Sequence, residues 1–185
     1  MEPNIWKQKA NEGCLAVCLL SLLEFKKGIK IDKDEEYSIL FEGMRFGPLD
    51  FSTGHLLYLA RKFPDIVFEQ HIEFKAFREK LEKLIMPNNL KLVPNKIYLR
   101  FLKKYLNDGP VIIYMDRYDV ADHHDITEMY HSPHFVILLN LNDETGTVLD
   151  PLTGTKIAIK VSKLMKSINF LRKKFWISPK LIKVV

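Results

Sequence analysis

The sequence predicts an α+β fold, with a helical N-terminal half packed on an antiparallel β-sheet from the C-terminal half. Up to about residue 109, apolar residues recur at the three- and four-residue spacing of amphipathic helices. From about residue 110 to residue 185, short apolar runs alternate with turn residues, as in strands joined by hairpins. The chain has 185 residues, of which 47% are hydrophobic, enough for a sizeable core. We therefore expect a single domain spanning residues 1–185.

The first half is organised around an apolar helix that is expected over residues 14–27. The polar residues 1–13, which include Pro3, predict an extended arm and a turn before it. Gly28 stands just past the expected end, where a left-handed glycine commonly closes a helix. Because the segment is apolar around most of its circumference, it is expected to be buried near the centre of the fold.

The remaining elements follow from the same two patterns. A second helix is expected over residues 32–46, and a third from an N-cap at Ser52 or Thr53 to just before Pro64. Three more helices are expected over residues 74–85, 97–106 and 161–172. Strands are expected over residues 66–72, 110–115, 134–141, 147–150, 156–159, 175–177 and 181–185, with a hairpin turn over 142–146.

The chain is mildly basic, with a net charge of +5, and the charge is unevenly distributed. After Asp150 there is no acidic residue, but there are nine Lys and Arg residues. Such a run can bind an anionic partner such as nucleic acid or a membrane surface. No RNA-recognition or helix-turn-helix pattern accompanies it, so we expect no nucleic-acid partner. We favour a solvated helix face balanced by acidic residues elsewhere, such as Asp32, Asp34, Glu35 and Glu36.

The two cysteines favour a reducing, intracellular compartment. Cys14 and Cys18 lie i, i+4 on one expected helix with parallel side chains, which disfavours a disulfide between them. Lys7 and Lys9 precede the apolar run at residues 15–23, as in a signal peptide, but no small-residue cleavage site follows. The run is also too short to cross a bilayer. We expect a cytoplasmic protein with no membrane span.

The start of the first expected helix is the first candidate for chemistry. Cys14 follows a polar turn, so its thiol stands where the helix dipole and free backbone N–H groups stabilise a thiolate. Gln8, six residues upstream, can return a side-chain amide N–H to the same place. With the backbone N–H of Cys14, it would hold the oxyanion that forms when a thiolate attacks a carbonyl group.

The predicted hairpin supplies a base and a carboxylate to orient it. His134 begins one strand and Asp150 ends the next, so the two residues can meet at the open end of the hairpin. Asp150 can accept the proton of one imidazole nitrogen and leave the other nitrogen facing Cys14. Taken singly, these residues have plainer explanations as a core cysteine, a strand-end histidine and a turn-forming aspartate. Together, in this order and spacing, they predict a thiol active site, whereas Cys18 is expected to belong to the core.

The same residues carry a resemblance to a known family. A glutamine six residues before a cysteine at the start of the first core helix, here Gln8 and Cys14, resembles the papain-like cysteine peptidases. The strand from His134, followed by a turn, Asp150-Pro151 and a nearby glycine, resembles the bacteriocin-processing (double-glycine leader) peptidases. The resemblance covers residues 8 to about 22 and 134–154.

This resemblance implies both a fold and an activity. The fold would be that of a papain-like cysteine peptidase, a thiol protease that hydrolyses a peptide or protein substrate and needs no cofactor. The family roles would fall on the oxyanion donor Gln8, the nucleophile Cys14, the base His134 and the orienting Asp150. Cys18 matches the family's second cysteine, whereas Gly13 and Leu15 stand where the family commonly has Asp and Gly.

Two alternatives stay open on the same residues. The thiol could serve a non-peptidase acyltransferase or amidase, since these enzymes also use Cys, His and Asp. The chain could instead be a catalytically inactive peptide-binding domain of the same fold, with a buried and unreactive Cys14. The oligomeric state is left open as well.

The polar segment 116–133 has no clear period and gathers acidic and histidine side chains, namely Asp119, Asp122, His123, His124, Asp125, Glu128 and His131. Such residues can bind zinc or another divalent metal, but no recognisable ligand spacing organises them, and we expect no metal site. We expect instead a polar loop that overhangs the cleft as a lid. Tyr130 could then touch the substrate, and the three histidines could make the pocket sensitive to pH.

Overall fold

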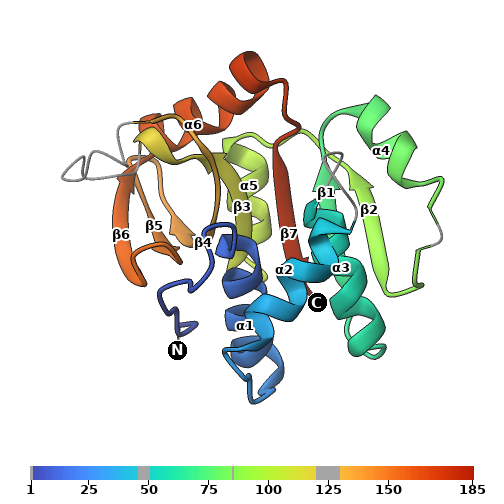
Figure 1. The fold of residues 1–185 in the computed structure, drawn as a ribbon. Coiled ribbons are helices and arrows are strands. Elements are labelled where there is room, and N and C mark those ends of the chain that lie inside the picture. Colours follow the sequence, from blue (N-terminus) through green and yellow to red (C-terminus); the bar gives the residue numbers. More distant parts are fainter. Residues whose placement is uncertain (1, 46–50, 85, 120–129) are drawn as a thin grey trace.

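The computed structural model describes residues 2–45, 51–84, 86–119 and 130–185. Within these residues the strands form one seven-stranded sheet in the order β2-β1-β7-β3-β4-β5-β6 (Figure 1). The strands are β1 Phe68–Ile72, β2 Leu90–Pro94, β3 Val111–Asp116, β4 Pro133–Leu141, β5 Thr145–Asp150, β6 Thr155–Lys160 and β7 Lys180–Val184. β1 and β2 pair in parallel, and the other pairings are antiparallel.

Six α-helices lie in the described part of the chain, close to where the sequence predicts them. They are α1 Cys14–Lys27, α2 Glu35–Met44, α3 Phe51–Lys62, α4 Lys75–Leu81, α5 Leu99–Leu106 and α6 Val161–Phe170. α1 has the predicted bounds, and Gly28 after it is left-handed, with φ of 64°. β3 continues into a 3₁₀ turn, Arg117–Asp119, and α6 continues into a π-helical turn, Leu171–Phe175.

The α+β class is right, but the division into a helical first half and an antiparallel second half is too simple. β1 and β2 come from the first half and belong to the same sheet as the later strands, and the sequence did not predict β2 or its parallel pairing. Asn89 explains the arrangement. Its side-chain amide donates to the carbonyl oxygens of Ala60, Phe63 and Ile66, and its own carbonyl accepts from the Phe68 N–H. One residue thus joins the end of α3 to the starts of both strands.

Two local predictions are wrong. α3 begins at Phe51, so Ser52 and Thr53 lie inside its first turn instead of capping it, and both side chains hydrogen-bond the buried Gln70 side chain of β1. The apolar run at residues 175–177 is not a strand. Its first residue ends the π-helical turn, and Trp176 is left-handed, with φ of 54°, so the backbone leaves the helix without entering the sheet.

The centre of the sheet is buried on both faces, with α1 on one of them (Figure 1). Ten consecutive residues of α1, 14–23, are buried. Ile112 and Ile137 belong to the cluster that contains α1, while Ile113 and Leu138 belong to the cluster that contains α5 and α6. Because neighbouring residues of a strand point to opposite faces, strands covered on both sides need continuous apolar runs. This explains why the apolar runs of β3 and β4 predict these two strands from the sequence.

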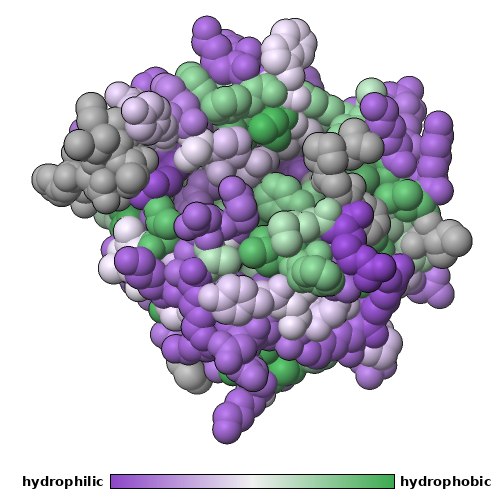
Figure 2. All heavy atoms as spheres, in the orientation of Figure 1, coloured by the Kyte–Doolittle hydropathy of each residue, from purple (hydrophilic) through white to green (hydrophobic). Residues whose placement is uncertain are grey.

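The side of the molecule that carries α2 has an exposed apolar stripe. Tyr37, Phe41 and Met44 are spaced i, i+4 and i+7 along α2 and are 50%, 62% and 59% exposed. Figure 2 shows apolar atoms gathered on this face among hydrophilic side chains. The opposite side of α2, which includes Ile39, is buried. Among the described helices, none has both the length and the apolar character needed to cross a membrane.

Candidate active site

The N-terminus of α1 presents a thiol that differs in surroundings from the second thiol one turn later. Cys14 is the first residue of the helix and is 6% exposed, and neither thiol is in a disulfide. The Val17 N–H is the first to bond within the helix, to the Gly13 carbonyl, so the earlier amide groups have no partner in the helix ladder. Cys18 is fully buried, its Sγ lies 3.7 Å from the Phe135 carbonyl oxygen, and burial raises its pKa well above the ordinary value. The prediction that Cys18 belongs to the core is confirmed.

His134 and Asp150 make the contact that the hairpin pattern predicts. His134 is the second residue of β4 and Asp150 is the last residue of β5, and they are 6% and 4% exposed. His134 Nε2 lies 2.7 Å from Asp150 Oδ1. The same carboxylate oxygen accepts the Leu152 N–H at 2.9 Å. Since Nε2 faces the carboxylate, Nδ1 is the ring nitrogen left for Cys14, whose side chain is near enough to raise the pKa of the ring.

His134 and Asp150 each favour the charged form of the other. Burial alone would lower the pKa of His134, but hydrogen bonds to Asp150 and Cys14 raise it to about 9. Burial alone would raise the pKa of Asp150, but its hydrogen bond with His134 holds that pKa below the ordinary value, helped by the Leu152 N–H and by Arg117. At neutral pH the His134 ring is therefore protonated, between the Cys14 side chain and the Asp150 carboxylate.

This pKa shift predicts how the stability of the fold depends on pH. Because the pKa of His134 is near 6.5 when unfolded and about 9 when folded, the folded state holds an extra proton between these values. The resulting stabilisation, on the order of 3 kcal/mol, is fully present below pH 6.5 and is lost as the pH rises through 9. Urea unfolding at pH 6 and pH 9.5 measures it. His134→Gln should flatten this dependence, and an equal loss in that variant would assign the effect to another group.

Gln8 lies beside the same corner of the fold, but its amide hydrogens are already used. Its backbone N–H donates to the Pro151 carbonyl at 2.7 Å, which places it next to Asp150. Its side-chain Nε2 donates to the carbonyl oxygens of Ala10 and Asn11, at 2.7 and 2.8 Å. Its Oε1 is buried and has no hydrogen-bond partner among the described residues. The predicted oxyanion donor is therefore close to the site but donates to the turn itself.

Glu36 is the neighbour of the site that the sequence reasoning misplaced. We expected it to balance distant lysines, but its carboxylate is fully buried and accepts the backbone N–H groups of Lys9 and Ala10. The signal in the sequence is helical spacing, since Glu36 shares the buried side of α2 with Ile39 and Gly43, three and seven residues later. A carboxylate on a buried helix face needs strong hydrogen-bond donors.

The segment 116–133 lies only partly within the described residues. Asp116 is fully buried and accepts the Ser132 N–H and a hydrogen bond from His131 Nδ1 at 2.7 Å. His131 stacks on Phe170 of α6 with ring centroids 3.9 Å apart, and Tyr130 is 70% exposed. The lid prediction, the side chain of Asp119 and the candidates Asp122, His123, His124, Asp125 and Glu128 lie outside the described residues. Among the residues that are described, no three His, Cys, Asp or Glu side chains are grouped to hold a metal ion.

The basic C-terminal segment finds acidic partners, though not the predicted ones. The ion pairs are Lys156 with Glu2, Arg172 with Glu73 and Lys183 with Asp108. Of the acids that we expected, Asp34 pairs with Lys9 and Glu35 with Lys62.

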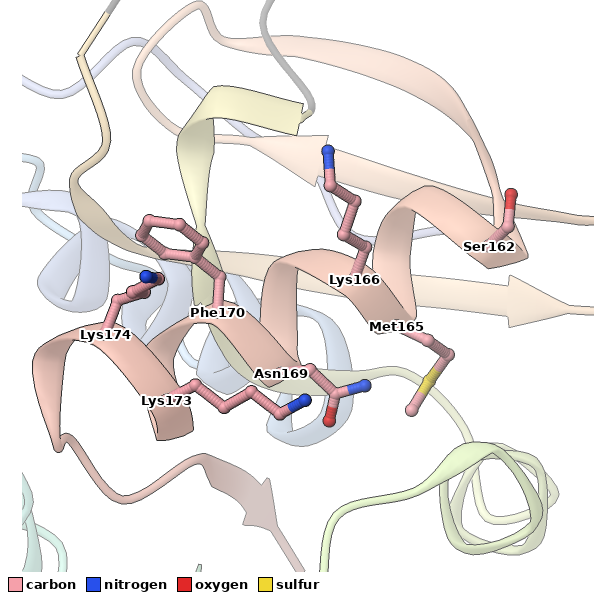
Figure 3. Close-up of a pocket in the computed structure, with 7 residues that line it drawn as sticks. All are labelled: Ser162, Met165, Lys166, Asn169, Phe170, Lys173 and Lys174. Carbon is pink, nitrogen blue, oxygen red and sulfur yellow. The ribbon is translucent and has the colours of Figure 1, made fainter.

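Some of the other lysines line a hollow of about 450 Å³ on α6 and the π-helical turn. Figure 3 shows its lining, Ser162, Met165, Lys166, Asn169, Phe170, Lys173 and Lys174. The hollow contains no residue of the Cys14–His134–Asp150 group.

Comparisons with known proteins give the fold an independent reference. One solved structure similar to this chain is that of a Bacillus anthracis protein provisionally described as a C39-like peptidase. The two share 16% sequence identity, with a TM-score of 0.57, over 98% of this chain and 93% of the other. No protein-family model and no curated protein matches the sequence. At this identity the similarity is one of fold, and this chain therefore has a fold like that of the C39-like peptidase.

Proposed function

We propose that this chain is a cysteine peptidase, with one peptidase domain spanning residues 1–185. The supporting observation is the buried group formed by Cys14, His134 and Asp150, in which the imidazole ring bonds the carboxylate and the Cys14 side chain raises the pKa of the same ring. An imidazolium ring held in this way stabilises a thiolate at neutral pH, and a thiolate is the nucleophile of thiol peptidases. The similarity in fold to a C39-like peptidase points to the same class of reaction.

In the proposed reaction the Cys14 sulfur attacks the carbonyl carbon of a peptide bond, and the carbonyl oxygen becomes an oxyanion. The Cys14 N–H donates to this oxyanion, joined by Gln8 Nε2 once it leaves one of its two carbonyl partners. His134 gives the proton on Nδ1 to the leaving amine as the C–N bond breaks, which leaves a thioester on Cys14 and a neutral imidazole. The imidazole then takes a proton from water, whose oxygen displaces the thiolate and releases the acid product.

The finer parts of the proposal concern substrate and location. A peptide with a double-glycine leader, as cleaved by the bacteriocin-processing peptidases, is the first substrate to test. The reaction requires a free thiol at Cys14, so we place the enzyme in the reducing cytoplasm.

A second candidate, an inactive peptide-binding domain with the same fold, is favoured by one observation. Both amide hydrogens of Gln8 are committed to the turn, so in this state the oxyanion would rely on the helix N-terminus alone. An acyltransferase using the same three residues would differ only in the group that accepts the acyl unit, and an amidase only in the bond that is cleaved. Either enzyme would form the same thioester on Cys14.

The proposal is tested by alkylation and by peptide cleavage in the same preparation. Iodoacetamide should label Cys14 rapidly near pH 7 and leave Cys18 unlabelled, as read by mass spectrometry. A set of peptides that includes double-glycine leaders should yield cleaved products, a result that Cys14→Ala should abolish and the matched variant Cys18→Ala should keep. A Cys14 thiol as inert as Cys18 would reject the catalytic proposal and favour the binding domain. A thioester on Cys14 that turns over only with an added amine acceptor would favour the transferase.

A further inference from the structure

We propose that Glu36 is a positioning residue of this site, an inference that rests on the proposed function. Its carboxylate is fully buried at the start of α2, a place where an ionised side chain needs strong donors. Glu36 Oε1 accepts the Lys9 and Ala10 N–H groups at 2.9 Å each, and Oε2 accepts the Lys9 N–H at 3.1 Å. Two successive backbone amides therefore point at one carboxylate.

These two amides belong to the turn that links the predicted oxyanion donor to the nucleophile. Ala10, whose N–H is held by Glu36, uses its carbonyl oxygen to accept both Gln8 Nε2 and the Gly13 N–H. The shape of the turn therefore depends on the orientation of Ala10, and Glu36 fixes that orientation from one side. Charge-assisted hydrogen bonds to backbone amides are roughly twice as strong as neutral ones, so a carboxylate holds the turn better than an amide side chain would.

The other end of the turn is fitted to the same carboxylate. A Cβ atom added at Gly13 would lie 2.0 Å from Glu36 Oε1 and 2.9 Å from Glu36 Cδ. Glu36 thus fills the space that a side chain before the nucleophile would occupy. Its negative charge also lies near the N-terminus of α1, where the helix dipole and the amide groups outside the helix ladder favour an anion.

From these contacts we infer that Glu36 sets the relative positions of the Gln8 amide, the first amides of α1 and the Cys14 sulfur. A displacement of about 1 Å in such a group can slow a reaction by roughly 100-fold without changing the reacting residues. The loss should appear in kcat far more than in KM, because the turn contacts the reacting bond and not the remote parts of a substrate.

The test compares Glu36→Gln with Glu73→Gln. Glu73 is a suitable control because its carboxylate is also largely buried and fully bonded, to Arg172 and to the Ile97 N–H, and it touches no part of the turn. Glu36→Gln should lower kcat by about 100-fold and change the pH profile of Cys14 alkylation, while Glu73→Gln should leave both unchanged. Circular dichroism and thermal unfolding of each variant report the cost to the fold.

Two results would overturn the inference. A folded Glu36→Gln protein with the wild-type alkylation profile and kcat would remove any role for the carboxylate. Equal losses in the Glu73→Gln variant would assign the effect to general stability. If Glu36→Gln does not fold, the inference is tested with Glu36→Asp, which keeps the charge but withdraws it by one methylene group. The readouts are again kcat and the pH profile of Cys14 alkylation. Alkylation needs no substrate, so it tests the effect of Glu36 on Cys14 even if the wild-type protein cleaves no peptide and the proposed function fails.

Discussion

Replacing His134 by alanine is expected to remove peptide cleavage almost completely and to destabilise the fold, because one side chain serves both. Loss of the base should lower kcat by about 10⁴- to 10⁶-fold, the range seen when a member of such a catalytic group is removed. The same change leaves the Asp150 carboxylate buried without its imidazole partner, supported by the Leu152 N–H and the charge of Arg117, which should cost about 3–5 kcal/mol. Steady-state kinetics and urea unfolding measure the two effects separately.

His134→Gln distinguishes the two roles in one experiment. Glutamine retains an N–H that can reach Asp150, so much of the lost stability should return, but it has no titratable nitrogen, so cleavage should stay absent. A His134→Ala protein that still cleaves peptide at near the wild-type rate would show that another group acts as the base.

Replacing Gly13 by alanine is expected to slow the chemistry of Cys14 by roughly 100-fold and to destabilise the protein by about 1–3 kcal/mol. The backbone at Gly13, with φ of −76°, accepts alanine without strain, so the effect comes from the collision of the added methyl group with Glu36. Either the carboxylate or the turn has to move. The measurements are the alkylation rate of Cys14 at pH 7 and the free energy of unfolding in urea.

Gly28→Ala at the other end of α1 is the matched control. Gly28 is left-handed, with φ of 64°, and an added Cβ there would meet no atom within 4 Å. Alanine should therefore cost about 1–2 kcal/mol through backbone strain alone and leave Cys14 alkylation unchanged. If the Gly28 variant slows Cys14 as much as the Gly13 variant does, the thiol responds to the stability of α1 and not to crowding at its N-terminus.

The parts of the site that the sequence predicts are those whose geometry follows from local pattern. α1 was bounded correctly because an apolar run ends at a glycine, and His134 and Asp150 meet because strands of one hairpin end side by side. The role of each residue in catalysis remains a prediction. The hydrogen bonds of the Gln8 side chain could not be predicted in this way, since its spacing from Cys14 does not indicate that its amide would donate to the turn.

The parts that the sequence does not predict depend largely on contacts with backbone groups, which the sequence pattern does not reveal. Glu36 bonds two backbone N–H groups about 26 residues away, and backbone groups are the same at every position. β2 is a five-residue edge strand that ends in Pro94 and pairs in parallel, and Asn89, which joins it to α3, acts through carbonyl oxygens. Ser52 and Thr53 resembled a helix cap because their hydroxyl groups suit either a cap or the side chain of Gln70.

The contact between the Gln8 N–H and the Pro151 carbonyl has a consequence for the order in which the protein becomes competent during its synthesis. A ribosome adds about 5–20 residues per second, so Asp150 is made roughly 7–27 seconds after Cys14. For most of this interval the nascent chain carries a thiol without the base His134, and throughout it the Asp150 carboxylate and the Pro151 carbonyl that holds the turn are missing. Pairings this distant in sequence form late, because their loop-closure entropy is paid before they stabilise anything. The proposed enzyme would therefore be inert until the chain has been made as far as Asp150 and Pro151.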